Sequence, residues 1–116
     1  MPTIGQIVER YGAPEFIRPL KVVGPEQDLY ILDVFYPQKG LSFEIRPNQK
    51  DAGQIKENMP ISIIEYFSPG NLTNYFIAKW SCDLGMDGAE STANKEINNE
   101  IRSWPCFGKI ELIETH

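Results

Sequence analysis

The segment Leu29–Tyr36 limits the folds open to this chain more than any other feature of its sequence. It reads Leu-Tyr-Ile-Leu-Asp-Val-Phe-Tyr, so every side chain except Asp33 is apolar or aromatic. Side chains of a strand alternate between the two faces of a sheet, so a strand of this composition is expected to be buried on both faces. Ile31 and Phe35 share one face, which needs a cover, either a helix of this chain or a partner.

The segments around this strand predict an antiparallel sheet. A short loop ending in Gly40 joins it to residues 41–46, in which apolar and polar residues alternate, and this pattern is typical of a β-hairpin. Residues 16–23 form an extended segment before the hairpin. Pro19 lacks a backbone N–H, so it places that segment at an edge of the sheet or divides it. The remaining segments are a strand over 61–67, a last strand over 109–114, and a polar loop or short surface helix over 47–59.

A short helix is expected directly before the sheet. Thr3 and Gln6 have the spacing of a capping box, in which each side chain satisfies a free backbone N–H of the other residue. Gly12 suits the left-handed position after the last turn, and Pro14 cannot continue a helix. Between these signals, one apolar stripe runs through Ile4, Ile7, Val8 and Tyr11.

Two further helices are predicted in the second half of the chain. The pair Ser68-Pro69 has the pattern of a cap followed by a first-turn proline, which opens a helix over residues 69–80. A loop over residues 83–91 follows. A third helix over residues 92–104 ends there, because Pro105 disfavours helical geometry in the residue before it.

Together these elements predict an α+β fold, an antiparallel sheet of about four to five strands with two to three helices packed on one face. A chain of 116 residues has the usual size of one domain, so residues 1–116 are expected to share a single core. The helix signal begins directly after Met1-Pro2. Such a start is compatible with a chain trimmed from a longer exported protein, whose missing N-terminal segment would hold its address.

Charge and hydropathy argue against two classes of partner. The net charge is −5, from 16 acidic and 11 basic residues spread along the chain, whereas nucleic-acid binding needs Lys and Arg concentrated on one face. No apolar run approaches the roughly 18 residues that suggest a membrane span, and no signal-peptide pattern is present. We therefore expect no nucleic-acid partner, and contact with a membrane only through a missing N-terminal anchor.

The sequence has no arrangement typical of catalysis or of metal or cofactor binding. The only histidine, His116, is the last residue, and chain ends are usually mobile, so no histidine-based triad or metal site is expected. Residues 83–90 contain three carboxylates, but Gly85 and Asn94 at the third and twelfth positions do not fit an EF-hand loop. A solvated turn and a weak, irregular cation site are the alternatives there. We expect no catalytic residue, no cofactor and no metal.

Asp33 is the carboxyl group whose position is most open to a chemical role. If it is buried, its pKa rises and it could act as a general acid or base. In the alternative arrangement, the alternate residues of the strand face the core and Asp33 faces water, across from Glu44 or Arg46. We adopt this second arrangement, because strand alternation explains it without a further assumption.

The two cysteines each follow a tryptophan by two residues, in Trp80-Ser81-Cys82 and Trp104-Pro105-Cys106. If the predicted helices pack side by side, the thiols of Cys82 and Cys106 meet and close a loop of about 25 residues, which would stabilise the fold by about 3 kcal/mol. A disulfide would indicate an oxidising compartment. The alternative is a pair of buried, reduced cysteines that act as small apolar groups. We favour the disulfide.

Residues 3–46 resemble the SmpA/OmlA/BamE family of small bacterial lipoprotein domains. Its hallmark is a capped helix with a Thr, then an apolar residue, then Leu-Gly-x-Pro. Tyr11 replaces the usual leucine, and the lipid-bearing cysteine of the family is not in this chain. The resemblance implies helices on one face of an antiparallel sheet and a role in scaffolding other envelope proteins. The matching positions are Thr3, Ile7, Tyr11, Gly12 and Pro14 in the helix and Tyr36, Leu41 and Phe43 in the hairpin.

We therefore expect a non-enzymatic protein-interaction or scaffolding domain of a bacterial envelope protein, in the periplasm or at the cell surface. Its candidate interaction surface is the sheet face that carries Ile31, Asp33 and Phe35, and its partner is a protein of unknown identity or a second copy of this chain. Two alternatives stay open. One is a small-ligand or lipid-binding module with a pocket between the sheet and residues 69–80, and the less favoured one is a hydrolase that uses Asp33 and Glu44.

Overall fold

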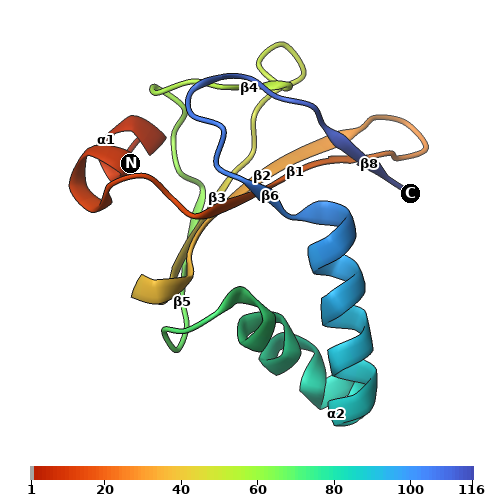
Figure 1. The fold of residues 1–116 in the computed structure, drawn as a ribbon. Coiled ribbons are helices and arrows are strands. Elements are labelled where there is room, and N and C mark those ends of the chain that lie inside the picture. Colours follow the sequence, from red (N-terminus) through yellow and green to blue (C-terminus); the bar gives the residue numbers. More distant parts are fainter. Residues whose placement is uncertain (1) are drawn as a thin grey trace.

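A central sheet carries one helix on each of its faces (Figure 1). A computed structural model describes residues 2–116. In chain order the elements are α1 (Ile4–Tyr11), β1 (Phe16–Val22), β2 (Leu29–Tyr36), the 3-10 turn η1 (Pro37–Lys39), β3 (Leu41–Ile45), β4 (Gln54–Ile55), β5 (Ile63–Tyr66), α2 (Leu72–Glu100), β6 (Arg102–Ser103), β7 (Gly108–Lys109) and β8 (Ile113–Thr115).

The apolar strand β2 lies in the middle of a sheet of six strands. The order is β5-β3-β2-β1-β6, and β8 also pairs with β1. All neighbouring pairs are antiparallel except β1 and β8, which are parallel. The expected α+β class and the β2–β3 hairpin are confirmed. The sheet is larger than expected because β6 and β8, at the two ends of the segment 102–115 that follows α2, both pair with β1.

Pro19 lies in the gap between the two short strands that share one side of β1. β6 pairs with residues 16–17 and β8 with residues 20–22, whereas β2 pairs with the whole of β1 on the other side. A proline cannot donate to a ladder, so it is tolerated where pairing is interrupted. The proline therefore coincides with a break in the neighbouring strand, and β1 itself is not divided.

Helix α1 begins and ends as its sequence signals predict. Both hydrogen bonds of the capping box are present, from the Thr3 N–H to Gln6 Oε1 at 2.9 Å and from the Gln6 N–H to Thr3 Oγ1 at 3.3 Å. The helix ends at Gly12, whose φ of 84° favours glycine and whose N–H donates to the Val8 carbonyl at 2.8 Å. Local signals thus define both ends of this helix, while its first N–H groups, those of Ile4 and Gly5, donate to the carbonyls of Met59 and Glu57.

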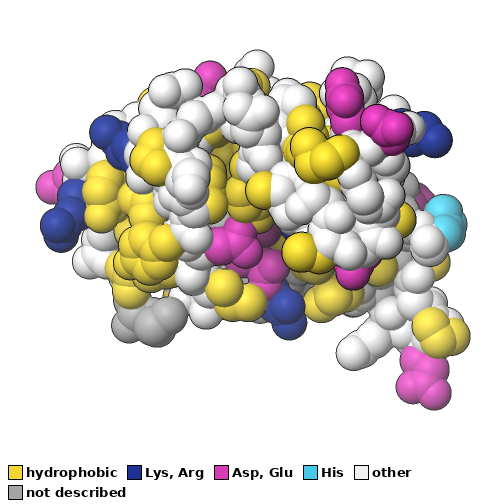
Figure 2. All heavy atoms as spheres, turned by 90° about the horizontal axis from the view of Figure 1, so that it is seen from below, with side chains coloured by type: hydrophobic (Ala, Val, Ile, Leu, Met, Phe, Trp, Pro, Cys, Tyr) yellow, Lys and Arg dark blue, Asp and Glu magenta, His cyan; other side chains and the backbone are white. Residues whose placement is uncertain are grey.

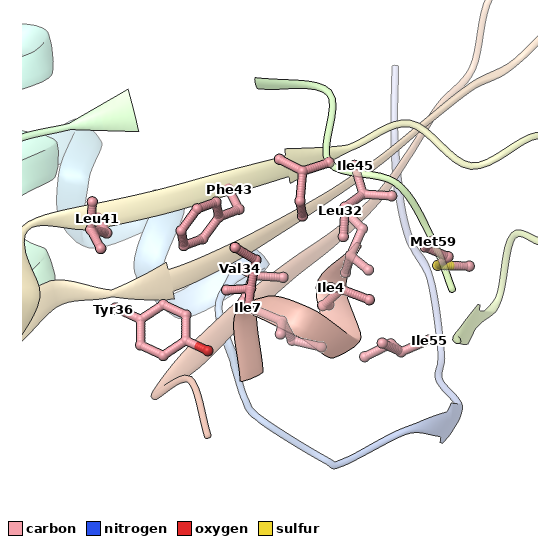
Figure 3. Packing of buried hydrophobic residues seen from close by; sticks show 12 residues of the cluster. Ile4, Ile7, Leu32, Val34, Tyr36, Leu41, Phe43, Ile45, Ile55 and Met59 are labelled. Atoms are coloured by element: carbon pink, nitrogen blue, oxygen red, sulfur yellow. The ribbon is translucent and has the colours of Figure 1, made fainter. Parts of the chain in front are cut away.

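The first core lies between α1 and one face of the sheet (Figure 3). Val34 and Tyr36 of β2 point toward α1, where Ile4 and Ile7 are buried. The hydroxyl of Tyr36 donates to the Gly12 carbonyl at 2.7 Å, which ties the end of the helix to the central strand. The remaining buried members are Ile17, Leu32, Leu41, Phe43, Ile45, Ile55, Met59 and Ile61.

The second core lies on the opposite face, between the sheet and α2. Phe35, which is adjacent to Val34 and so points the other way, packs edge to face against Phe76 with ring centroids 5.9 Å apart. The helices therefore lie on both faces of the sheet, where helices on one face were expected. The physical reason is the composition of β2, whose apolar residues on each face both need to be shielded from water.

Helix α2 replaces the two helices predicted in the second half of the chain. It is helical through residues 83–91, which were expected to form a loop, and breaks only at Gly85, where φ is 71° and ψ is 176°. We call residues 72–84 its first arm and residues 86–100 its second arm. The two arms meet at an angle below the sheet (Figure 1).

Both ends of α2 also differ from expectation. Asn71, and not Ser68, is the N-cap, and its side chain accepts from the Asn74 N–H at 2.8 Å. The second arm ends at Glu100, before Trp104, because residues 102–103 leave the helix to pair with β1. Sheet pairing, and not Pro105, therefore decides where this helix stops.

The segment that follows β3 completes the first core. β4 pairs with β7 in a small second sheet, and Ile55, Met59 and Ile61 are buried against α1 and the main sheet. The expectation of a polar loop or surface helix over 47–59 missed this anchoring. Within residues 2–116, no helix is long and apolar enough to cross a membrane.

Candidate functional site

Two residues of the predicted interaction surface, Asp33 and Phe35, lie beneath α2. Asp33 is 7% and Phe35 2% exposed, and Ile31 is half-buried. Of the two covers that the sequence left open, a helix of the same chain is the one present. These three residues therefore do not form an open apolar face in this structure. The expectation that Asp33 faces water is wrong, because α2 packs over that face.

Arg18 joins Asp33 to α2 in a buried polar cluster. Its Nε donates to Asp33 Oδ2 at 2.9 Å, and its Nη1 donates to Glu96 Oε2 at 2.7 Å. Glu96 belongs to the second arm, and its other oxygen accepts from the indole Nε1 of Trp80 in the first arm at 3.0 Å. One network thus connects β1, β2 and both arms of the helix.

Burial governs the titration of this cluster. Loss of water raises the pKa of Asp33 above its usual value, and the attraction of Arg18 opposes but does not cancel this effect. Burial likewise raises the pKa of Glu100, whose carboxylate lies 3.8 Å from Arg18. For Arg18 itself, burial lowers the pKa, but the nearby carboxylates raise it further, so the guanidinium remains charged.

The cavity beside this cluster is small. It has a volume of about 80 Å³ and lies between the sheet and the first arm of α2, where a ligand pocket would be expected. Ligand sites usually have volumes of at least about 300 Å³. In the described part of the chain, every buried side-chain nitrogen or oxygen has a hydrogen-bond partner. This cavity therefore has room for water but offers no free polar group to a ligand.

A larger hollow of about 450 Å³ lies elsewhere, at the β1–β2 turn. It is lined by the β1–β2 turn, the start of β2 and the loop after β3, namely Gly24, Glu26, Gln27, Asp28, Leu29, Tyr30, Pro47, Asn48 and Gln49. None of the residues singled out from the sequence for a chemical role lies in it.

Strand β5 is an exposed edge of the sheet. It stands at the end of the strand order, next to β3, and all four of its residues are exposed. The exposed fractions are 47% for Ile63, 39% for Ile64 and 77% for Tyr66. The sequence predicted a strand here, but its pattern does not show whether another helix or strand covers it.

The register of β5 assigns its side chains to the two faces. Ile64 pairs with Phe43 and Tyr66 with Leu41, so both lie on the face of the first core. Ile63 and Glu65 lie on the α2 face, and Glu65 accepts a hydrogen bond from the hydroxyl of Tyr75. The exposed edge is therefore apolar on one face and carries a carboxylate on the other.

The ladder also determines which backbone groups of β5 point outward. The N–H of Phe67 donates to the Gly40 carbonyl at 2.9 Å. Because backbone direction alternates along an antiparallel ladder, Ile63 and Glu65 point their backbone groups toward β3, and Ile64 and Tyr66 point theirs away from the sheet. These outward N–H and C=O groups are available for a further strand.

Hydrophobic and acidic side chains lie next to one another on the surface seen from below (Figure 2). Acidic side chains gather near the centre of this view, and hydrophobic side chains form broad areas beside them. Glu44 and Glu65 line the small cavity together with Ile63. The apolar edge of the sheet thus adjoins Glu44 and Glu65, with Arg18 and Lys79 lining the same cavity.

The expected disulfide is absent from the structure. Cys82 and Cys106 are both free and exposed. Cys82 lies three residues before the Gly85 break, at the junction of the two arms, whereas Cys106 follows β6 after the chain has returned to the sheet. The second arm ends at Glu100, so Cys106 does not lie at the end of a helix beside Cys82 as was expected. The alternative of two buried thiols is also wrong.

Residues 83–91, which were expected to form a loop, belong to α2 and show no metal centre. In residues 2–116, no group of three or more His, Cys, Asp or Glu side chains is placed to hold a metal ion.

Comparisons with protein families, with curated proteins and with solved structures found no match to this chain. The site is therefore assigned from its geometry.

Proposed function

We propose that this chain is a non-enzymatic protein-interaction domain that binds its partner along the free edge of β5. The observation that carries the proposal is the exposure of all four β5 residues, three of them apolar or aromatic, at an open edge of the sheet. Soluble proteins usually shorten, charge or cover such edges, because a free edge pairs readily with another strand. An apolar edge that remains uncovered is typical of strand addition by a partner.

The polar cluster supports a structural role for α2 over a catalytic one. Asp33 is engaged by Arg18 at 2.9 Å, and the adjoining cavity of about 80 Å³ does not accommodate a substrate. The network instead holds the helix on the sheet and so keeps the second core covered. With α2 in place, three exposed apolar or aromatic residues of the sheet, Ile63, Ile64 and Tyr66, stand together on β5.

The cell envelope is the proposed setting, on the strength of the resemblance to the SmpA/OmlA/BamE family. That resemblance rests on the capped helix α1 and the following hairpin, which Tyr36 and Gly12 connect through the 2.7 Å hydrogen bond. Members of the family scaffold other envelope proteins. A scaffolding domain needs a surface for a partner, and the free edge of β5 supplies one.

The proposal is tested by crosslinking at the edge. A photoreactive amino acid in place of Tyr66 should yield a discrete crosslinked protein in cells that contain the native partner. The same group in place of Gln38, an exposed residue of η1, is the matched control. Adducts at position 66 alone support the proposal, and equal or absent adducts at the two positions overturn it.

A proline variant separates strand addition from simple side-chain contact. Ile64→Pro removes an outward N–H but leaves the ladder with β3 intact, because proline is tolerated where its nitrogen faces solvent. Ile64→Val keeps the N–H and most of the apolar surface. Loss of the crosslink at position 66 in Ile64→Pro but not in Ile64→Val, with both variants folded by circular dichroism, indicates pairing through the backbone.

A further inference from the structure

We infer that the segment bound at β5 is an extended peptide in which apolar residues alternate with Lys or Arg. The inference rests on the proposed function and adds the chemistry of the partner. It follows from three properties of the edge, namely its free backbone groups, the apolar row on one face and, on the other face, a carboxylate without an ion pair in residues 2–116, although Arg18 and Lys79 line the same cavity.

The free backbone groups require an extended partner. The N–H and C=O of Ile64 and of Tyr66 point away from β3, as the ladder geometry dictates. Only a chain in strand conformation can match groups at this spacing with its own alternating donors and acceptors. Such a partner presents its side chains alternately to the two faces of the sheet.

On the face of the first core, the added strand meets apolar neighbours. Ile64 lies beside Phe43 and Tyr66 beside Leu41, and these rows continue into the core around Tyr36. Tyr66, at 77% exposed, has the most surface to lose. Cross-strand neighbours on one face stabilise a sheet when they are apolar or aromatic together, so every second residue of the partner should be apolar.

On the α2 face, the added strand meets negative charge. Glu65 accepts from the neutral hydroxyl of Tyr75 and takes part in no ion pair with any cation of residues 2–116. Glu44, one strand further in, has only the exposed Arg46 as a cationic partner, at 2.8 Å. A Lys or Arg opposite Glu65 on the added strand would form an ion pair with the Glu65 carboxylate.

Charge also favours a separate partner over a second copy of this chain. Each copy carries a net charge of −5 and would bring its own Glu65 to the shared edge. Like charges on neighbouring strands are destabilising. A basic segment avoids this repulsion and is attracted by the field of the whole domain.

Three labelled synthetic peptides test the inference by fluorescence anisotropy. The first alternates Val and Lys, the second has the same composition with the Val and Lys residues in two blocks, and the third alternates Val and Glu. We expect the first peptide to bind at least about tenfold more tightly than either of the others. Equal binding of the first and second peptides, or of the first and third, overturns the inference.

Two charge variants identify the carboxylate that is responsible. Glu65→Gln keeps an acceptor for Tyr75 but removes the charge, and should weaken the Val-Lys peptide about threefold, as for one exposed ion pair. Glu9→Gln removes one charge from the exposed side of α1 and should leave affinity unchanged. An equal loss in the two variants would mean unspecific attraction and overturns the inference.

Amide exchange and the crosslinked partner distinguish this inference from the proposed function. The Val-Lys peptide should slow hydrogen exchange at the amides of Ile64 and Tyr66, and unchanged exchange overturns the inference. If position 66 captures a native partner whose bound segment lacks the apolar-basic alternation, the interaction domain stands and the partner chemistry is wrong. If the peptide fails and position 66 captures no partner, both are wrong.

Discussion

Trp80 and Glu96 lie on opposite sides of the Gly85 break, and the indole Nε1 of Trp80 donates to Oε1 of Glu96 at 3.0 Å. The second oxygen of Glu96 accepts from Arg18 of β1 at 2.7 Å. One carboxylate therefore holds the two arms of α2 together and ties them to the sheet. This connection keeps α2 over the face that the sequence left open to a partner, so that the free edge of β5 becomes the accessible surface.

The Glu96 connection should contribute measurably to stability. Glu96→Ala leaves Arg18 short of one partner in a largely buried position, so we expect the free energy of unfolding to fall by about 2 to 4 kcal/mol. Glu90→Ala, at an exposed position of the same arm, should change it by less than about 0.5 kcal/mol. Urea denaturation measures both values, and similar losses in the two variants would contradict this role of Glu96.

Asp33 should make stability depend on pH in a defined direction. Because burial raises the pKa of Asp33 in the folded protein, its contribution is fully present below the ordinary pKa and is lost as pH rises through the folded value. Asp33→Asn removes this titration and should still fold. Denaturation at several pH values from about 4 to 7 should therefore show the stability of the native protein, relative to the variant, decreasing as pH rises. An increase would contradict the assigned direction.

Gly85 should resist substitution because of its backbone geometry. Its φ of 71° and ψ of 176° lie in a region that is almost restricted to glycine, and nothing in the structure lies within 4 Å of a Cβ placed there. Gly85→Ala should therefore lower the free energy of unfolding by about 1 to 3 kcal/mol through backbone strain alone. Gly70→Ala is the control, because its site is equally open and its φ is not in the left-handed region. Equal effects of the two substitutions in thermal denaturation would be the contrary result.

The two cysteines should behave as independent, accessible thiols. Because Cys82 and Cys106 are free and exposed, a thiol-reactive dye should label both in the native protein without reductant or denaturant. A double Cys→Ser variant should melt within about 2 °C of the native protein, since exposed substitutions have small effects. Labelling that requires reductant, or a large drop in melting temperature, would contradict this prediction and indicate a disulfide between the two cysteines.

Local sequence signals were sufficient for the elements whose hydrogen bonds lie within a few residues. Thr3 and Gln6 cap α1 through groups three positions apart, and Gly12 ends it by its own backbone freedom. The β2–β3 hairpin was likewise predictable, because alternation and a short turn define its register. The α+β class followed from these elements.

The candidate site depended on contacts that no local pattern contains. Asp33 was assigned to water because strand alternation shows which face a residue occupies, but not whether a distant helix covers that face. The position of α2 depends on Gly85 and on the bond between Arg18 and Glu96. Arg18 and Glu96 are 78 residues apart in the sequence. The exposure of β5 similarly follows from its place in the strand order.

By itself, the sequence determined the strands β1, β2, β3 and β5, the limits of α1 and the need to cover both faces of β2, since these follow from side-chain alternation and local hydrogen bonding. Only the tertiary structure decided that α2 supplies the second cover, that the thiols stay apart and that β5 remains uncovered. The physical reason is that burial depends on which distant elements meet, and long-range packing and ion pairing determine those meetings.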